Sequence, residues 1–144
     1  MFQFNLITPY EVRHKHAYYF KGITDAIEKG GSDHTADDVL REIYNGGVYL
    51  YDVLDEESVL HGFIVLQEYT DCYSSKLVLH VDYAYLSHQT SGLMELYQSL
   101  PIFGAAKGFD QIAFNSNRKG WDRYRERTGF NGATRVFYKD LQHG

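Results

Sequence analysis

A histidine close to a carboxylate is the simplest arrangement in this sequence that could move a proton. His80 and Asp82 stand two residues apart, within a run rich in β-branched and aromatic residues. Histidine titrates near neutral pH, so such a pair is suited to exchanging a proton with a bound molecule. Because successive residues of a strand point to opposite faces, at most one of the two is expected to face any single pocket.

Two further groups resemble fragments of a metal site. His14 and His16 are two residues apart, and residues at that spacing do not share a helix face, so they cannot jointly bind an ion from a helix. The acidic segment 33–38 also contains a histidine, but the start of a helix accounts for its carboxylates. No metal is therefore predicted. The chain also lacks the G-x-S-x-G, P-loop and dinucleotide-binding patterns.

The composition excludes several classes of protein. The chain has 144 residues and a formal net charge of −5, which argues against generic nucleic-acid binding. Its single cysteine, Cys72, fits a reducing compartment and rules out a thiolate zinc site. No run of about 18 apolar residues could span a membrane, and no signal peptide begins the chain. A cytoplasmic protein is expected.

Hydrophobic periodicity and capping residues predict the element order β-α-α-β-β-β-α-β-α-β. One long helix is expected from Pro9 to about Lys29, and a second helix between Thr35 as N-cap and Gly46. The other helices are predicted over 90–107 and 118–128. Strands are predicted over 2–6, 48–54, 62–69, 76–86, 111–114 and 133–141.

The lengths of the connections predict how these strands pair. Short polar segments separate the three strands between 48 and 86, which indicates an antiparallel meander. The helix over 90–107 is long enough to be a crossover, so the strands that it joins should be parallel. Pro101 is expected to kink or divide this helix, and Gly108 to end it. No linker interrupts the chain, so a single domain over residues 1–144 is expected.

A spaced motif lies near the C-terminus. Asn117 is followed by Gly120 three residues on and by Tyr124 seven residues on, and Gly129-Phe130 closes the predicted helix. This motif and the element order from Val48 to Leu141 resemble the GNAT superfamily of acyl-CoA-dependent N-acetyltransferases. The Gly-Phe pair comes one residue later than is usual in that family. The resemblance implies an α/β (α+β) fold, in which helices flank a mixed, twisted, mostly antiparallel sheet.

The resemblance also implies an activity and roles for particular residues. An acetyl group would pass from acetyl-CoA to an amine by direct attack, and Tyr124 would protonate the departing thiolate. Main-chain groups of Val81 to Tyr83 would bind the pantetheine arm and polarise the carbonyl, and Asn117 would contact the cofactor. Asp82 and His80 are the preferred general bases, and Glu68 and His88 are alternatives.

A second family motif would hold the pyrophosphate of acetyl-CoA at the start of the helix over 90–107. Backbone N–H groups at a helix N-terminus suit an anion. The matching residues are Gln89, Thr90, Ser91, Gly92 and Leu93, and Met94 replaces the small residue that ends the family pattern. A register shifted by one residue would place His88 and Ser91 in the motif positions instead.

The sequence also allows a function other than acetyl transfer. Met94 in the phosphate loop and the 13 tyrosines of the chain also suit a catalytically inactive GNAT-fold protein with a binding or structural role. In its small size the chain resembles acetyltransferase-like proteins of tailed bacteriophages. This resemblance would place the protein in a virion. The expected partners are an amine-bearing small molecule or protein acceptor in the first case, and a protein partner or a second copy in the other.

Overall fold

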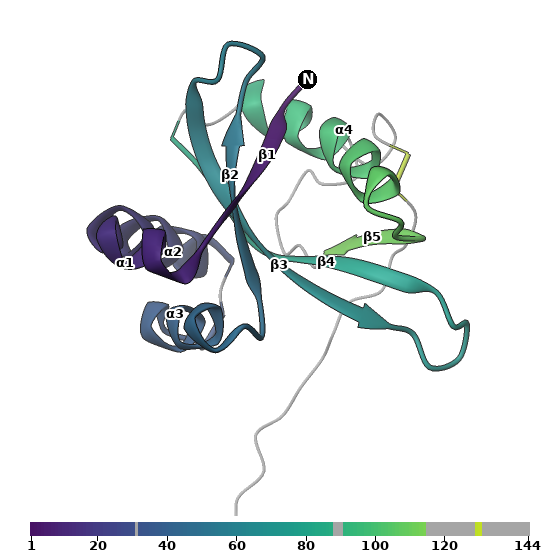
Figure 1. The fold of residues 1–144 in the computed structure, drawn as a ribbon, viewed down its shortest axis with the longest axis horizontal. Helices are drawn as coiled ribbons and strands as arrows, with labels where there is room; N and C mark the ends of the chain where they lie inside the picture. Colours follow the sequence, from purple (N-terminus) through teal and green to yellow (C-terminus); the bar gives the residue numbers. More distant parts are fainter. Residues whose placement is uncertain (31, 88–90, 115–128, 131–144) are drawn as a thin grey trace, which may run out of the picture.

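The computed structural model describes residues 1–30, 32–87, 91–114 and 129–130 (Figure 1). These residues form one sheet in which each strand lies beside its neighbour in sequence. Helices cover both faces of the sheet. The strands are β1 (Gln3–Ile7), β2 (Tyr49–Leu54), β3 (Leu60–Thr70), β4 (Leu77–Leu86) and β5 (Gln111–Phe114), and the helices are α1 (Pro9–His14), α2 (His16–Gly30), α3 (Ala36–Asn45) and α4 (Ser91–Ala106).

The pairing of the strands agrees with the sequence prediction. The pairs β1–β2, β2–β3 and β3–β4 are antiparallel, and the pair β4–β5 is parallel. The parallel pair is joined by α4, the crossover helix that such a connection requires. The meander and the crossover are both confirmed. The helix predicted over 118–128 and the strand over 133–141 lie outside the described residues.

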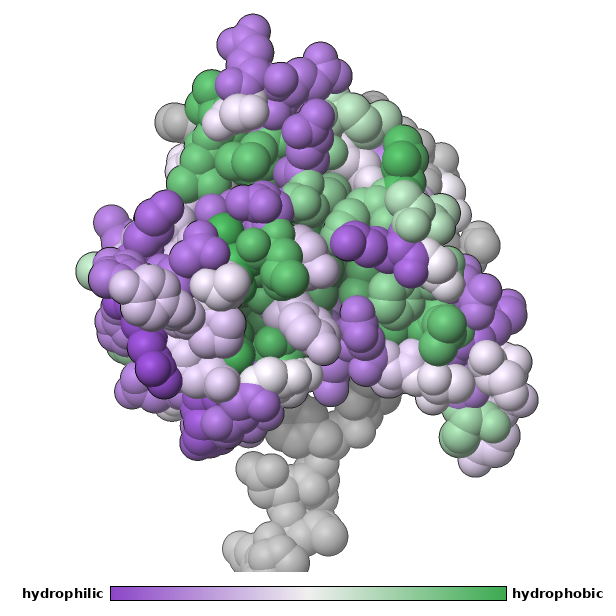
Figure 2. All heavy atoms as spheres, viewed as in Figure 1, coloured by the Kyte–Doolittle hydropathy of each residue, from purple (hydrophilic) through white to green (hydrophobic). Residues whose placement is uncertain are grey.

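The sheet separates two hydrophobic cores. Helices α1, α2 and α3, called here the helical layer, lie on one face, and α4 lies on the other (Figure 1). Over the helical layer the surface in Figure 2 is mostly hydrophilic, as expected for helices whose apolar sides face a sheet. Fully buried side chains on the helical-layer side include Val12, Tyr19, Ile23, Leu50, Phe63 and Val65, and on the α4 side Val53, Ile64, Leu66, Leu96 and Leu100.

The helix predicted from Pro9 to Lys29 is two helices, so this prediction is wrong. Its start is confirmed, with Thr8 as N-cap of α1 and Pro9 in the first turn. The chain leaves helical geometry at Lys15 (φ −111°, ψ 30°), and the amide of Tyr19 begins the new helix by bonding to the Lys15 carbonyl. The buried residues Val12 and Tyr19 stay at helical spacing across the break, so periodicity could not reveal it.

Pro101 does not divide the helix predicted around it. α4 runs without interruption from Ser91 to Ala106 and ends before Gly108, which has a positive φ of 88°. Leu96 and Leu100 are fully buried on the inner face of α4. Ser99, between them, accepts a hydrogen bond from the backbone N–H of Phe2 at 2.9 Å. Packing against the sheet therefore holds α4 together in spite of the missing proline N–H.

One carboxylate is buried between β2 and the helical layer. Asp52 is 6% exposed and accepts a hydrogen bond of 2.9 Å from the hydroxyl of Tyr19, which is fully buried. Burial raises the pKa of the Asp52 carboxyl, and the hydrogen bond from Tyr19 opposes this shift. Burial likewise raises the pKa of the adjacent Tyr18 to about 12. The protein therefore keeps an ionisable acid in a place that favours its neutral form.

We expect Asp52→Asn to remove a loss of stability that the wild-type protein undergoes as pH rises. The pKa of Asp52 in the folded protein lies above its ordinary value of 3.8. Its contribution to stability is therefore complete below that value and is lost as pH rises through the folded-state pKa. Asparagine keeps an oxygen for the Tyr19 hydrogen bond and carries no charge. Urea unfolding of both proteins from about pH 4 to about pH 8 measures the effect.

As pH rises, the free energy of unfolding of Asp52→Asn should increase relative to that of the wild-type protein. All other titratable groups are common to both proteins, so this difference reports on Asp52 alone. A difference that stays constant with pH would contradict the assignment. Tyr19→Phe removes the donor of the hydrogen bond to Asp52 and keeps the carboxylate. It leaves the buried carboxylate without its donor, and should lower the free energy of unfolding by about 1–3 kcal/mol at neutral pH.

Candidate active site

A β-bulge interrupts β4 at Asp82. Val65 of β3 pairs with Tyr83, but the next residue, Leu66, pairs with Val81, so Asp82 is an extra residue on β4. Such a bulge leaves one residue outside the regular ladder and bends the strand. Bulges are frequent beside active sites, where they re-aim side chains and main-chain groups.

The bulge also changes which side chains of β4 face which core. Before it, Leu79 and Val81 pack on the α4 side, and after it Ala84 and Leu86 do so. The side-chain alternation has therefore shifted by one residue. As a result, Tyr83 points to the helical layer.

The pairing between β4 and the described part of β5 reaches the same place. It runs from Val78 opposite Gln111 to Val81 opposite Phe114. β4 itself continues to Leu86, which is about 13 Å beyond Asp82 at the usual rise of a strand. The first residue of α4, Ser91, follows after a short connection. The bulge, the far part of β4 and the N-terminus of α4 thus follow one another along the chain.

His80 and Asp82 form a hydrogen-bonded pair at the bulge. The His80 Nδ1 lies 2.6 Å from the Asp82 Oδ1, and each side chain is 20% exposed. The prediction that at most one of them faces a single pocket is wrong, because residues two apart on a strand share a face. That face is the one turned to the helical layer, since Leu79 and Val81 point to α4. With Nδ1 bonded to the carboxylate, Nε2 is the nitrogen that can exchange a proton.

Tyr83 connects β4 to the loop between α2 and α3. Its hydroxyl lies 2.8 Å from the Nδ1 of His34 and 3.2 Å from the Oγ of Ser32. The Ser32 hydroxyl also accepts a hydrogen bond of 3.2 Å from the backbone N–H of His34. Sequence reasoning missed this link, because its partners are 49 residues apart and form no local pattern. The loop is therefore fixed directly beside the bulge.

The other residues predicted for the site fall into two groups. Val81 is 5% exposed and packs with Leu93 on the α4 side of the sheet. A side-chain carbon added at Gly92 would lie 3.5 Å from Leu86 and 3.8 Å from Phe2, so this position faces the core. Ser91 begins α4. The predicted site residues outside the described part of the chain are His88, Gln89, Thr90, Asn117 and Tyr124.

The end of the C-terminal motif lies at the end of β5. The Phe130 ring is 5.1 Å from the Phe114 ring and 6.1 Å from the Tyr97 ring of α4. Gly129 has a positive φ of 76°, which suits the residue that follows a helix. The Phe130 side chain thus packs against both β5 and α4.

Neither a metal cluster nor a membrane helix is found in the part of the chain that the structure describes. No three side chains of His, Cys, Asp or Glu gather there in a way that could hold a metal ion. No helix among these residues is both long and apolar enough to cross a bilayer. His14 and His16 lie at the end of α1 and the start of α2.

No protein-family model matches the chain, and no curated protein is similar to it in sequence. Solved structures, however, match nearly its whole length. A ribosomal-protein-alanine N-acetyltransferase from Brucella melitensis biovar Abortus 2308 has a TM-score of 0.64 at 11% identity, with all of both chains covered. The fold is that of the GNAT-type acetyltransferases.

Two further solved structures have the same GNAT fold. An aminoglycoside acetyltransferase from an uncultured soil metagenomic sample, in complex with trehalose, has a TM-score of 0.66 at 17% identity, covering 98% of this chain and 97% of that one. An aminoglycoside N-acetyltransferase in complex with CoA has a TM-score of 0.62 at 15% identity, covering 99% and 95%. The predicted fold class is confirmed, and the bacteriophage resemblance stays a prediction.

We expect Tyr83→Phe to loosen the loop between α2 and α3, because the variant loses the hydroxyl bonded to His34 and Ser32. The opening free energy of the His34 amide should fall by about 0.5–1.5 kcal/mol, the net value of a typical hydrogen bond. Native-state hydrogen exchange measures this change. Tyr85→Phe is the matched control, since it removes a hydroxyl from the same face of β4. An equal effect in both variants would contradict the role given to Tyr83.

Proposed function

We propose that this protein transfers an acetyl group from acetyl-CoA to an amine, which is carried by a small molecule or a protein. The observation that carries the proposal is the bulge at Asp82, which lies in the strand of this GNAT fold that pairs with β5 in parallel. When bound, acetyl-CoA supplies a thioester carbonyl as the electrophile and a thiolate as the leaving group. The residues of the chain have to bind it, polarise that carbonyl and move two protons.

The start of α4 suits the phosphates of the donor. The first N–H groups of a helix have no partner within the helix, and the helix dipole adds positive charge there. α4 has 16 residues and no acidic side chain in its first turn, so no carboxylate of that turn repels an anion. The backbone of Ser91, Gly92 and Leu93, with Gln89 and Thr90 before them, would hold the pyrophosphate.

The main chain around the bulge suits the rest of the donor. Val81 to Tyr83 span the bulge, and their backbone groups would pair with the pantetheine arm. An N–H group freed by a bulge can donate to the carbonyl oxygen and stabilise the negative charge that develops there. Asn117 would contact the same arm.

His80 is the general base that the geometry favours. Asp82 holds one ring nitrogen, which leaves the other to take the proton of the attacking amine. The alternative base Glu68 pairs with Leu79, whose side chain faces α4. Residues opposite each other on antiparallel strands share a face, so Glu68 lies on the face away from His80. Tyr124 would return a proton to the thiolate.

Ser91→Glu tests the phosphate site at the start of α4. A carboxylate there repels phosphate but also stabilises the helix, so weaker binding would not come from unfolding. We expect wild-type protein to bind acetyl-CoA with a micromolar Kd, about −8 kcal/mol, and the variant at least about tenfold more weakly. Ser91→Gln is the control of equal size and should bind like wild type. Isothermal calorimetry measures all three.

No binding of acetyl-CoA at sub-millimolar concentration would overturn the proposal. The catalytically inactive alternative, a GNAT-fold protein that binds another protein, would then apply. Unchanged binding in Ser91→Glu would leave the donor in place but contradict the proposed position of its phosphates.

His80→Gln tests the general base once an acceptor has been found by screening. Loss of a general base typically lowers the rate about 10²- to 10⁴-fold, and the dependence of kcat/KM on that base's titration should vanish. His61→Gln is a matched control, because His61 forms a similar pair with Asp55 at 2.9 Å in a different part of the sheet. Tyr124→Phe should lower kcat in the same assay. Unchanged turnover in either test variant would remove that residue from the mechanism.

A further inference from the structure

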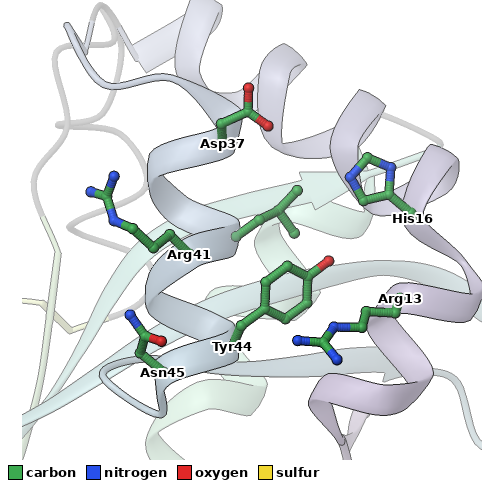
Figure 3. Close-up of a pocket in the computed structure, with 7 residues that line it drawn as sticks. Arg13, His16, Asp37, Arg41, Tyr44 and Asn45 are labelled. Carbon is green, nitrogen blue, oxygen red and sulfur yellow. The ribbon is translucent and has the colours of Figure 1, made fainter.

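A hollow of about 380 Å³ lies between α3 and the junction of α1 with α2 (Figure 3). This volume falls within the range of about 300–1,000 Å³ that is usual for small-molecule sites. The break at Lys15 shapes the hollow, because Arg13 comes from the last turn of α1 and His16 is the first residue of α2. None of its residues takes part in the acetyl transfer proposed above.

The wall formed by α3 combines a charge with an apolar surface. Asp37, Leu40 and Tyr44 all line the hollow and stand at positions i, i+3 and i+7, so they share one face of the helix. Leu40 is only 2% exposed and provides an apolar part of the lining. Seven residues of helix separate Asp37 from Tyr44, which corresponds to about 10 Å along the axis.

The two ends of this wall carry opposite charges. The guanidinium of Arg13 lies over the Tyr44 ring, 4.8 Å from its centre, and Asp37 stands in the first turn of α3. Among the described residues, no ion pair within 4.0 Å involves Arg13 or Asp37.

Arg41, which also lines the hollow, differs from Arg13. It forms ion pairs with Asp38 at 3.5 Å and Glu42 at 3.9 Å. Its side chain leaves α3 on the side away from Arg13 and His16 (Figure 3). The charges that face the hollow without an ion-pair partner in the described chain are therefore one anion, Asp37, and one cation, Arg13, which lies over Tyr44 two helical turns from Asp37.

We infer that this hollow binds a zwitterion about as long as an extended tripeptide with free termini, because about 10 Å of helix axis separates Asp37 from Tyr44, over which Arg13 lies. Asp37 pairs with the ammonium group, and Arg13 donates its N–H groups to the carboxylate while Tyr44 supports the guanidinium. Leu40 and the Tyr44 ring contact the middle of the ligand. The inference goes beyond the proposed acetyl transfer and does not rest on it.

Calorimetric titration of the full chain with trialanine, in the absence of acetyl-CoA, tests the site. We expect saturable binding between the micromolar and the millimolar range. Trialanine with an acetylated N-terminus, or with an amidated C-terminus, should bind at least about tenfold more weakly, because each lacks one charge. Dialanine should also bind more weakly, because it is too short to reach both ends.

Variants locate the site on the protein. Arg13→Gln and Asp37→Asn should each weaken trialanine binding at least about tenfold. Lys29→Gln, the matched control, should bind like wild type, because Lys29 pairs with Asp25 at 3.1 Å and does not line the hollow. Thermal unfolding checks that each variant is folded, and the blocked peptides test the same charges on the wild-type protein. The inference is overturned if trialanine does not saturate by about 10 mM, if the blocked peptides bind equally well, or if Lys29→Gln weakens binding as much as Arg13→Gln.

Discussion

The bulge at Asp82 is the constraint on which the candidate active site depends. An extra residue in β4 shifts the side-chain alternation, so that Tyr83 turns to the helical layer while Val81 stays on the α4 side. The bulge also leaves Asp82 outside the regular ladder between β3 and β4. A regular strand would not give Tyr83 this orientation.

Packing on both faces of the sheet holds this irregular strand in place. On the α4 side, fully buried Leu96 and Leu100 keep a helix continuous through Pro101. On the other side, a buried carboxylate, Asp52, is kept at a cost in free energy that its bond to Tyr19 reduces. Hydrogen bonds of the Tyr83 hydroxyl with Ser32 and His34 then fix the loop that precedes α3 to β4. The site therefore rests on a rigid sheet and has one fixed loop beside it.

Local signals in the sequence were enough to predict most of the described fold. The capping residues Thr8 and Thr35 do mark helix starts, because a side-chain oxygen can satisfy a free backbone N–H within a few residues. β-branched and aromatic runs located β2 to β5, and the long segment before Gln111 required a parallel crossover. The GNAT resemblance, drawn from the motif around Tyr124 and the element order, anticipated the fold that the solved structures share.

The sequence by itself determined the strands, most helix ends and the topology, since these follow from periodicity, capping and connection length. Only the tertiary structure decided three features. The register of β3 against β4 placed the bulge at Asp82, packing and hydrogen bonding broke the first helix at Lys15, and a contact across 49 residues joined His34 to Tyr83. The bulge and the contact depend on residues far apart in the chain. The helix break depends on a small energy difference between two local backbone geometries. No local sequence pattern therefore encodes any of the three features.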